Sequence, residues 1–287
     1  MRSIALIACI AAAICHAQQA RESLEKRADD DAKRIESLEK YGSRLEGAHI
    51  ILYFPESLTR LEAEALIKRL DPAVGGLWRR VGVHDWQLVP KGKIKYYLGE
   101  DDFVAHANGR SAVFVPMARV KDGRAPFLHE ATHELLASKH RPPGVLLGPG
   151  VVRWPLWLIE GMADYLARVV GHEFGIIEAG AWGTPTVDGV DAVCAERLRT
   201  PEGAKMMPFV GANAFPDVLI TAERVKFAPA FYACSFSLTK RLAEHVGLDN
   251  LIGLFAVPPE ESLRRLDKVA GRPLVQVVQE WRTRLGE

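Results

Sequence analysis

The sequence predicts an α+β fold, in which a small N-terminal sheet is followed by a mostly helical C-terminal half. Short apolar runs, rich in β-branched and aromatic residues, predict strands at 49–54, 93–98 and 111–116. Further along the chain the apolar residues recur at helical spacing, over 156–171, 189–199, 229–246, 248–256, 260–270 and 273–285. With 287 residues, of which 48% are hydrophobic, the chain has ample side chains for a core.

Residues 1–17 have the pattern of a secretory signal peptide. Arg2 supplies a positive start, residues 4–14 form an apolar run, and Cys15-His16-Ala17 ends in a small residue suited to cleavage. The run is too short for a transmembrane helix, and no later apolar stretch approaches that length. The segment before Cys9 resembles a lipoprotein box, but its apolar part is too short for us to expect a lipid anchor. We therefore expect an exported protein, periplasmic or secreted, without a transmembrane helix.

A charged lead segment, residues 18–46, comes next. Its apolar residues are loosely spaced as a helical stripe: Leu24, Ala28, Ile35, Leu38 and Leu45. This spacing predicts either one helix that packs lightly on the body of the protein or a short coiled segment. The remaining residues, 47–287, form the main domain, which we divide into an α+β half (47–155) and a helical half (156–287).

Two helices are expected in the α+β half. The first covers residues 58–81, with breaks at Asp71-Pro72 and Gly75-Gly76, because proline and glycine disfavour a helix interior. The second opens at Pro126, a residue type favoured in the first helical turn. Its apolar residues have helical spacing: Phe127, Leu128, Ala131, Leu135 and Leu136.

This second helix carries the motif His129-Glu130-Ala131-Thr132-His133. Two histidines four positions apart lie on one face of a helix, so both imidazoles can bind the same metal ion. Glu130 is then placed to contact a water molecule on that metal. Glu134 is turned away from this face, and we expect it to face solvent. A catalytic zinc site needs three protein ligands and one open position, so a third ligand must come from elsewhere.

The apolar run at 157–165 contains two carboxylates, Glu160 and Asp164. A carboxylate in such a run is costly unless it is paired or bound to a metal, so Glu160 is the predicted third ligand. Asp164 follows four positions later on the same helical face, where it can accept the other N–H of a ligand histidine. The alternative for Asp164 is a surface or capping carboxylate. We expect one Zn²⁺ ion.

Together the two segments resemble the gluzincin metallopeptidases, the clan of thermolysin and the aminopeptidase-like enzymes. The resemblance implies a zincin-like fold, zinc held by His129, His133 and Glu160, and Glu130 as the general base. The interval from His133 to Glu160 is longer than in thermolysin. It contains a Pro/Gly-rich loop at 141–150, which is either a connector or a wall of the substrate cleft.

A third segment, Tyr232-Ala233-Cys234-Ser235, resembles the tyrosine-bearing helix of aminopeptidase-like gluzincins and of small bacterial peptidases. The resemblance implies that Tyr232, with His172 or another histidine that we cannot place, stabilises the oxyanion, the negative oxygen that develops on the substrate carbonyl during hydrolysis. A buried core tyrosine is the alternative. By analogy with zincin-like folds, residues 111–116 are the expected edge strand that pairs with an extended peptide substrate.

The resulting hypothesis is an exported zinc metallopeptidase that hydrolyses peptide bonds in a peptide or protein substrate. Two alternatives stay open: a non-catalytic, zinc-stabilised protein that binds envelope partners, and a zinc hydrolase that acts on a non-peptide amide. The 37 basic and 36 acidic residues give a net charge of +1, so we expect no nucleic-acid partner. Cys194 and Cys234 would remain after cleavage, and the sequence leaves open whether they pair. It does not predict the oligomeric state.

Overall fold

The computed structural model describes residues 25–83, 92–139, 154–178 and 186–286. The predicted signal peptide at 1–17 and the Pro/Gly-rich loop at 141–150 lie outside the described residues. Within the described part of the chain, no helix is both long enough and apolar enough to cross a membrane.

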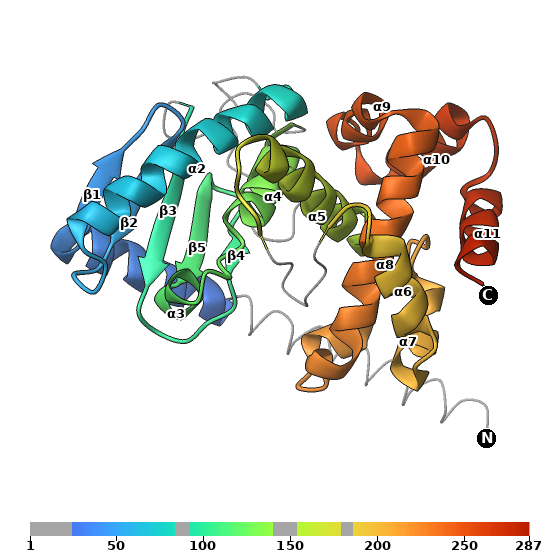
Figure 1. Cartoon of the computed structure of the whole chain (residues 1–287), viewed down its shortest axis with the longest axis horizontal. Coiled ribbons are helices and arrows are strands. Elements are labelled where there is room, and N and C mark those ends of the chain that lie inside the picture. Colours follow the sequence, from blue (N-terminus) through green and yellow to red (C-terminus); the bar gives the residue numbers. More distant parts are fainter. Residues whose placement is uncertain (1–24, 84–91, 140–153, 179–185, 287) are drawn as a thin grey trace.

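The α+β class is confirmed: one mixed five-stranded sheet is joined to a helical half (Figure 1). The strand order is β1-β2-β3-β5-β4. The bounds are Ser43–Glu46 for β1, Ile50–Phe54 for β2, Ile94–Gly99 for β3, His106–Ala107 for β4 and Ala112–Pro116 for β5. The three strands predicted from the sequence are β2, β3 and β5, which pair in parallel at the centre. Central parallel strands are covered on both faces, which explains their nearly continuous apolar runs.

Residues 111–116 are not the edge strand, so this prediction is wrong. Strand β5 is paired on both sides, parallel to β3 and antiparallel to β4. The edge next to β5 is β4, whose two residues are too few to show an alternating pattern in the sequence. At the opposite edge, β1 pairs with β2 in antiparallel orientation.

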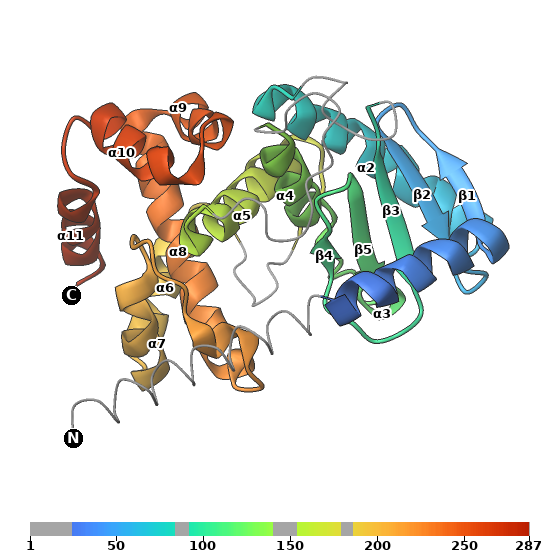
Figure 2. The ribbon, with the colours of Figure 1, turned by 180° about the vertical axis from the view of Figure 1, so that it is seen from behind.

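Helices cover both faces of the sheet (Figures 1 and 2). Helices α2 (Arg60–Val81) and α4 (Phe127–Lys139) pack on one face, and a helix over residues 25–41 packs on the other. Leu38 of this first helix is buried in a small cluster with Tyr53, Tyr97 and Phe114 of the sheet. The lead segment is therefore a helix on the sheet, and its last apolar residue, Leu45, lies in β1.

Helix α2 is continuous, so the predicted breaks at Asp71-Pro72 and Gly75-Gly76 are wrong. Tertiary contacts compensate for the poor helix formers. The Asp71 carboxylate accepts the backbone N–H groups of residues 48–50, at 2.8 to 3.1 Å. A Cβ on Gly75 would lie 2.5 Å from the ring of His49, so glycine permits the close approach of this ring to the helix.

The second half of the chain is helical, as predicted. After the short α3 (Met117–Lys121) in the first half and α4, the helices are α5 (Leu156–Glu173), α6 (Val190–Leu198), α7 (Pro201–Met206), α8 (Arg224–Val246), α9 (Leu248–Gly253), α10 (Pro259–Ala270) and α11 (Leu274–Leu285). Helix α5 lies between α4 on the sheet side and the long α8 on the other side (Figure 1). A disulfide between Cys194 and Cys234 joins α6 to α8, which settles the pairing that the sequence left open.

Candidate metal centre

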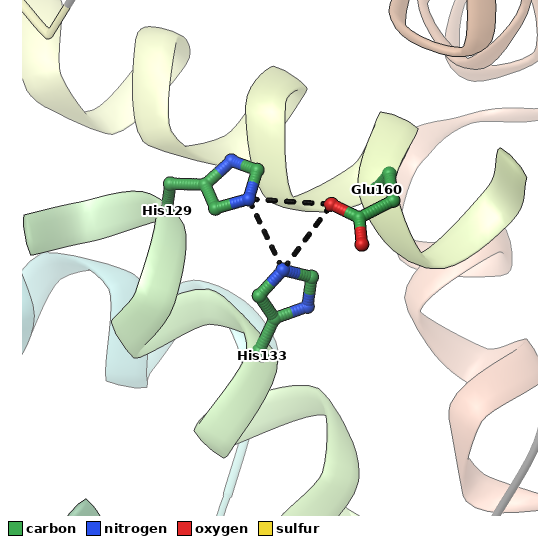
Figure 3. Close-up of side chains that lie close together, drawn as sticks. All are labelled: His129, His133 and Glu160. Atoms are coloured by element: carbon green, nitrogen blue, oxygen red, sulfur yellow. Dashed lines mark hydrogen bonds and ion pairs between the residues drawn. The ribbon is translucent and has the colours of Figure 1, made fainter. Parts of the chain in front are cut away.

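Two helices bring three potential metal ligands together (Figure 3). Helix α4 supplies His129 and His133, whose Nε2 atoms are 3.1 Å apart. Helix α5 supplies Glu160, whose Oε2 lies 3.4 Å from Nε2 of His129 and 3.5 Å from Nε2 of His133. Each residue points one ligand atom at the same point, so this group could hold a metal ion.

The start of α4 is held from two sides. The Tyr96 hydroxyl on β3 donates to the Phe127 carbonyl at 3.0 Å. The Glu178 carboxylate, which follows α5, accepts the backbone N–H groups of Leu128 at 2.5 Å and His129 at 3.2 Å. Burial raises the pKa of Glu178 to about 7, against the opposite effect of these two donors. This helix cap could not be predicted from local sequence, because the carboxylate comes from 50 residues further along the chain.

Asp164 lies behind His129, one turn after Glu160 on α5. Its Oδ1 is 3.2 Å from Nδ1 of His129 and 3.2 Å from Nη1 of Arg168. A carboxylate accepts a hydrogen bond, so Nδ1 of His129 carries a proton, which would leave Nε2 as the atom that binds a metal ion. Arg168 was not among the predicted site residues, although its position four residues after Asp164 places both on one helical face.

Charges in this group shift the pKa values of its members. Burial disfavours the charged form of His129, but Asp164 and Glu160 outweigh burial and raise its pKa well above the usual value. Burial likewise disfavours ionised Glu160, but His133 and His129 outweigh it and lower the pKa of that carboxyl. The carboxylates around His129 therefore favour positive charge at that imidazole, in the place where a cation would lie.

Glu130 is buried on α4 between the two histidines. Tyr232 on α8 is also buried, and its hydroxyl accepts a hydrogen bond from Nη2 of Arg224 at 3.2 Å. Burial, followed by the charge of Glu160, raises the pKa of Tyr232; Glu130 adds to this effect and Arg224 opposes it. The structure therefore brings Glu130 and Tyr232 into one electrostatic environment with Glu160.

A glycine contact explains why α8 comes so close. A Cβ on Gly161 would lie 2.4 Å from the backbone carbonyl oxygen of Ser235 and 2.2 Å from Oγ1 of Thr239. Gly161 follows Glu160, and Ser235 is one turn beyond Tyr232. The two helices thus touch through backbone at the point where α5 presents Glu160 and α8 presents Tyr232.

Two residues do not lie where the sequence suggested. His172 is exposed in the last turn of α5, twelve positions after Glu160, which corresponds to about 18 Å along the helix. It therefore cannot act beside Tyr232. Glu134 does not face solvent: it is fully buried and accepts the backbone N–H groups of Gly109 at 2.5 Å and Ser111 at 2.7 Å. It is turned off the metal face as expected, but that side of α4 packs on the β4–β5 turn.

Comparisons with known proteins add little to this geometry. No family model and no curated protein matches the sequence. Among solved structures, a functionally unknown conserved protein from Bacillus anthracis str. Ames is similar at 16% identity and a TM-score of 0.45. A mutant of a functionally unknown conserved protein from the same organism is similar at 15% identity and the same TM-score. Each alignment covers 84% of this chain and 48% of the other, so the chain spans about half their length. Likeness at this level carries no conclusion about fold or function.

The class that fold and site define is therefore an α+β protein with a His₂Glu group, one histidine buried and the other two residues partly buried, that could hold a metal ion.

Proposed function

We propose that this protein is a zinc-dependent metallopeptidase with a zincin-like fold. The observation that carries the proposal is the convergence of His129, His133 and Glu160, with Glu130 beside them and Asp164 behind them. This is the arrangement expected of a catalytic zinc site, which has three protein ligands and a fourth position for water or substrate.

Ligand spacing supports zinc. Zinc binds histidine nitrogen and carboxylate oxygen at about 2.0–2.2 Å in tetrahedral geometry, which requires ligand atoms about 3.3–3.5 Å apart. The three separations between Nε2 of His129, Nε2 of His133 and Oε2 of Glu160 are 3.1, 3.4 and 3.5 Å. One ion could therefore bind all three ligands with only a small change in their positions.

The balance of buried charge also supports a divalent cation. Glu130 and Asp164 are buried, and Glu160 is largely so, whereas Arg168 is the buried guanidinium beside them. Several carboxylates gathered away from water are costly unless cations compensate for them. A Zn²⁺ ion between neutral imidazoles supplies the missing positive charge.

The side chains then divide the work of hydrolysis. Zinc, when bound, acidifies water and polarises a carbonyl group. Glu130 accepts a proton from the attacking water and delivers it to the nitrogen of the leaving amine. Tyr232 donates a hydrogen bond to the oxyanion that develops on the substrate carbonyl. Asp164 holds His129 in the tautomer that keeps Nε2 free for the metal.

The Cys194–Cys234 disulfide supports the further proposal that the protein is exported. Disulfides persist in oxidising compartments and are rare in the cytosol. Both sulfur atoms are buried in the helical half, where the bond has a structural place between α6 and α8.

The experiment is a comparison of wild-type protein with Glu130→Gln, and with Glu196→Gln as an exposed control on α6. Metal analysis should find one zinc per chain in all three, and digestion of denatured casein should be abolished by a chelator and restored by zinc. We expect Glu130→Gln to lose at least about a hundredfold of the hydrolysis rate while it keeps its zinc.

Two outcomes would contradict the proposal. If Glu130→Gln cut casein as fast as wild type, Glu130 would not be the base. If zinc-loaded wild type cut no peptide, the site would belong to a non-catalytic binding protein or to a hydrolase of non-peptide amides, and a panel of acylated amines would separate these two.

A further inference from the structure

Four charged side chains lie where the lead helix, residues 25–41, meets the sheet. Asp31 and Arg34 come from this helix, Asp101 from the loop between β3 and β4, and His106 from β4. We call these four residues the His106 cluster. The helix crosses the face of the sheet from the side of β4 to the side of β1 (Figure 2). The side chains of Asp31, Arg34 and His106 are each at most 13% exposed, so water and salt screen their charges little.

Both ring nitrogens of His106 face oxygen atoms that accept hydrogen bonds. Nδ1 lies 2.8 Å from the carbonyl oxygen of Val104, and Nε2 lies 3.0 Å from each carboxylate oxygen of Asp31. A neutral imidazole has one N–H and one lone pair, so one of these contacts would set a lone pair against an oxygen. The imidazolium ion has two N–H donors and satisfies both contacts. The geometry therefore calls for a protonated His106.

The other members of the cluster favour this positive charge. Nη1 of Arg34 donates to Oδ1 of Asp31 at 3.0 Å, and Nε and Nη2 of Arg34 donate to Asp101 at 2.6 to 3.1 Å. With a charged His106 the cluster has two cations and two anions, whereas a neutral ring would leave one negative charge uncompensated. The ring also stacks on Phe114 with centroids 5.0 Å apart, and the face of an aromatic ring favours a cation.

The hairpin that carries His106 is also held from the other face of the sheet. Glu134 is the titratable group that faces this hairpin from α4, and it accepts the backbone N–H groups of Gly109 and Ser111 in the β4–β5 turn. These bonds fix the turn without using His106. A change at the His106 cluster therefore acts first on the lead helix rather than on α4.

The far end of the lead helix is fastened without a histidine. Leu38 is buried against the sheet, and the Glu39 carboxylate accepts hydrogen bonds from Lys95 at 2.9 Å and Tyr97 at 2.7 Å. Arg34 binds Asp101 whether or not the imidazole is charged. Loss of the contact between His106 and Asp31 would therefore release residues 25–33 and leave residues 34–41 in place.

We propose that His106 is a pH-sensitive contact that fastens the beginning of the lead helix, residues 25–33, to strand β4. The fastened form holds one proton more than a neutral ring does, so it is favoured as the pH falls and weakens as the pH rises. Histidine ordinarily exchanges this proton with water between pH 5 and 8. After the proton has left, the ring turns away from one of its two acceptors. This role is independent of the proposed peptidase activity.

Two measurements on the full chain test this role. Nitrogen-15 NMR of the wild-type His106 ring, at pH 5 and pH 8, reports which ring nitrogens carry hydrogen. Hydrogen exchange, followed by mass spectrometry and corrected for the intrinsic effect of pH, reports the protection of residues 25–33, with residues 34–41 as the internal reference. The variants are His106→Gln, which cannot be charged, and Asp31→Asn, which removes the anion. His245→Gln is the matched control, because His245 is an exposed histidine on α8.

At pH 5 we expect both ring nitrogens of His106 to carry hydrogen and residues 25–33 to be protected. At pH 8 their protection in the wild type should be at least about tenfold lower, since a hydrogen bond between charged groups contributes that much. Residues 34–41 should change little. His106→Gln should remove the pH dependence, and Asp31→Asn should lower the protection at pH 5 towards the wild-type value at pH 8. His245→Gln should follow the wild type at both pH values.

Any of three results would overturn this role. They are a neutral His106 ring at pH 5, equal protection of residues 25–33 at pH 5 and pH 8 in the wild type, and a pH dependence in His106→Gln as large as that of the wild type. If His106→Gln did not fold, NMR of the wild type and exchange of Asp31→Asn would still decide the matter. Each of these results leaves the peptidase proposal intact, which is tested separately by Glu130→Gln.

Discussion

Gly161 offers the sharpest test of how the site is assembled, because its missing side chain lets α5 and α8 touch. In Gly161→Ala, the new Cβ would lie 2.4 Å from the Ser235 carbonyl oxygen and 2.2 Å from Oγ1 of Thr239. The threonine hydroxyl can rotate away, but the carbonyl belongs to the helix backbone. Since carbon contacts normally lie at about 3.5 Å or more, α8 must move away by about 1 Å.

The size of the effect follows from two opposing terms. Overpacking of a buried contact costs about 1–3 kcal/mol, and the backbone clash places Gly161→Ala near the upper end. Alanine is a better helix former than glycine by about 1 kcal/mol, which offsets part of the loss. We therefore expect a net loss of about 2 kcal/mol in the free energy of unfolding. For a protein of this size that corresponds to a fall in Tm of about 4–8 °C.

The assay is thermal unfolding followed by circular dichroism, with Gly253→Ala as the control. Gly253 is helical at the end of α9, and a Cβ there would meet no atom within 4 Å. Gly253→Ala should therefore raise stability slightly while Gly161→Ala lowers it. The displaced α8 also carries Tyr232 away from Glu160, so the peptidase rate should fall more than the folded fraction does. If Gly161→Ala were as stable and as active as wild type, the close contact would not be what positions Tyr232.

Three further predictions concern other parts of the molecule. Asp164→Asn leaves Nδ1 of His129 without a carboxylate, and we expect zinc affinity to fall about 10- to 100-fold in competition with a chelator; unchanged affinity would remove this role. Glu39→Gln removes a carboxylate whose pKa, despite burial, is lowered by hydrogen bonds from two sheet side chains. Because the pKa of Glu39 is lower in the folded than in the unfolded protein, its ionised carboxylate stabilises the fold at pH values above the unfolded pKa, near 4.5. This stabilisation is lost as the pH falls further and the carboxylate is protonated. The variant should therefore be less stable by up to about 1 kcal/mol at pH 7, and the difference in urea midpoints should shrink between pH 5 and pH 3. Replacing Cys194 and Cys234 by alanine removes a cross-link between residues 40 positions apart, and the free energy of unfolding measured with denaturant should fall by about 4 kcal/mol. A fall below about 1 kcal/mol would mean that the disulfide contributes little to stability.

The parts of the site that are local in sequence could be predicted. Helical periodicity alone places His129 and His133 on one face of α4, and the structure brings their Nε2 atoms to 3.1 Å. Glu160 was identifiable because it lies in an apolar run, where an isolated carboxylate needs a partner. Asp164 was identifiable because it follows Glu160 by four positions and so shares its helical face.

The parts that depend on tertiary contacts could not be predicted. Helical periodicity shows that Glu134 is turned off the metal face, but it does not show that the β4–β5 turn covers that side. Glu178 caps α4 from 50 residues away, and no local pattern near it indicates a cap. In α2, the propensity of Pro72 and the glycines to end a helix was outweighed by packing against His49 and by the bonds of Asp71. Propensity is a weak guide where such contacts compete with it.

The most direct test of the central claim is an anomalous difference map, recorded at the zinc edge from crystals of the zinc-loaded wild-type chain. We expect one strong peak about 2.0–2.2 Å from Nε2 of His129, Nε2 of His133 and a carboxylate oxygen of Glu160, with a fourth position open to solvent. A peak bound by other residues, or a Glu160 side chain turned away from a zinc held by the histidines alone, would contradict it.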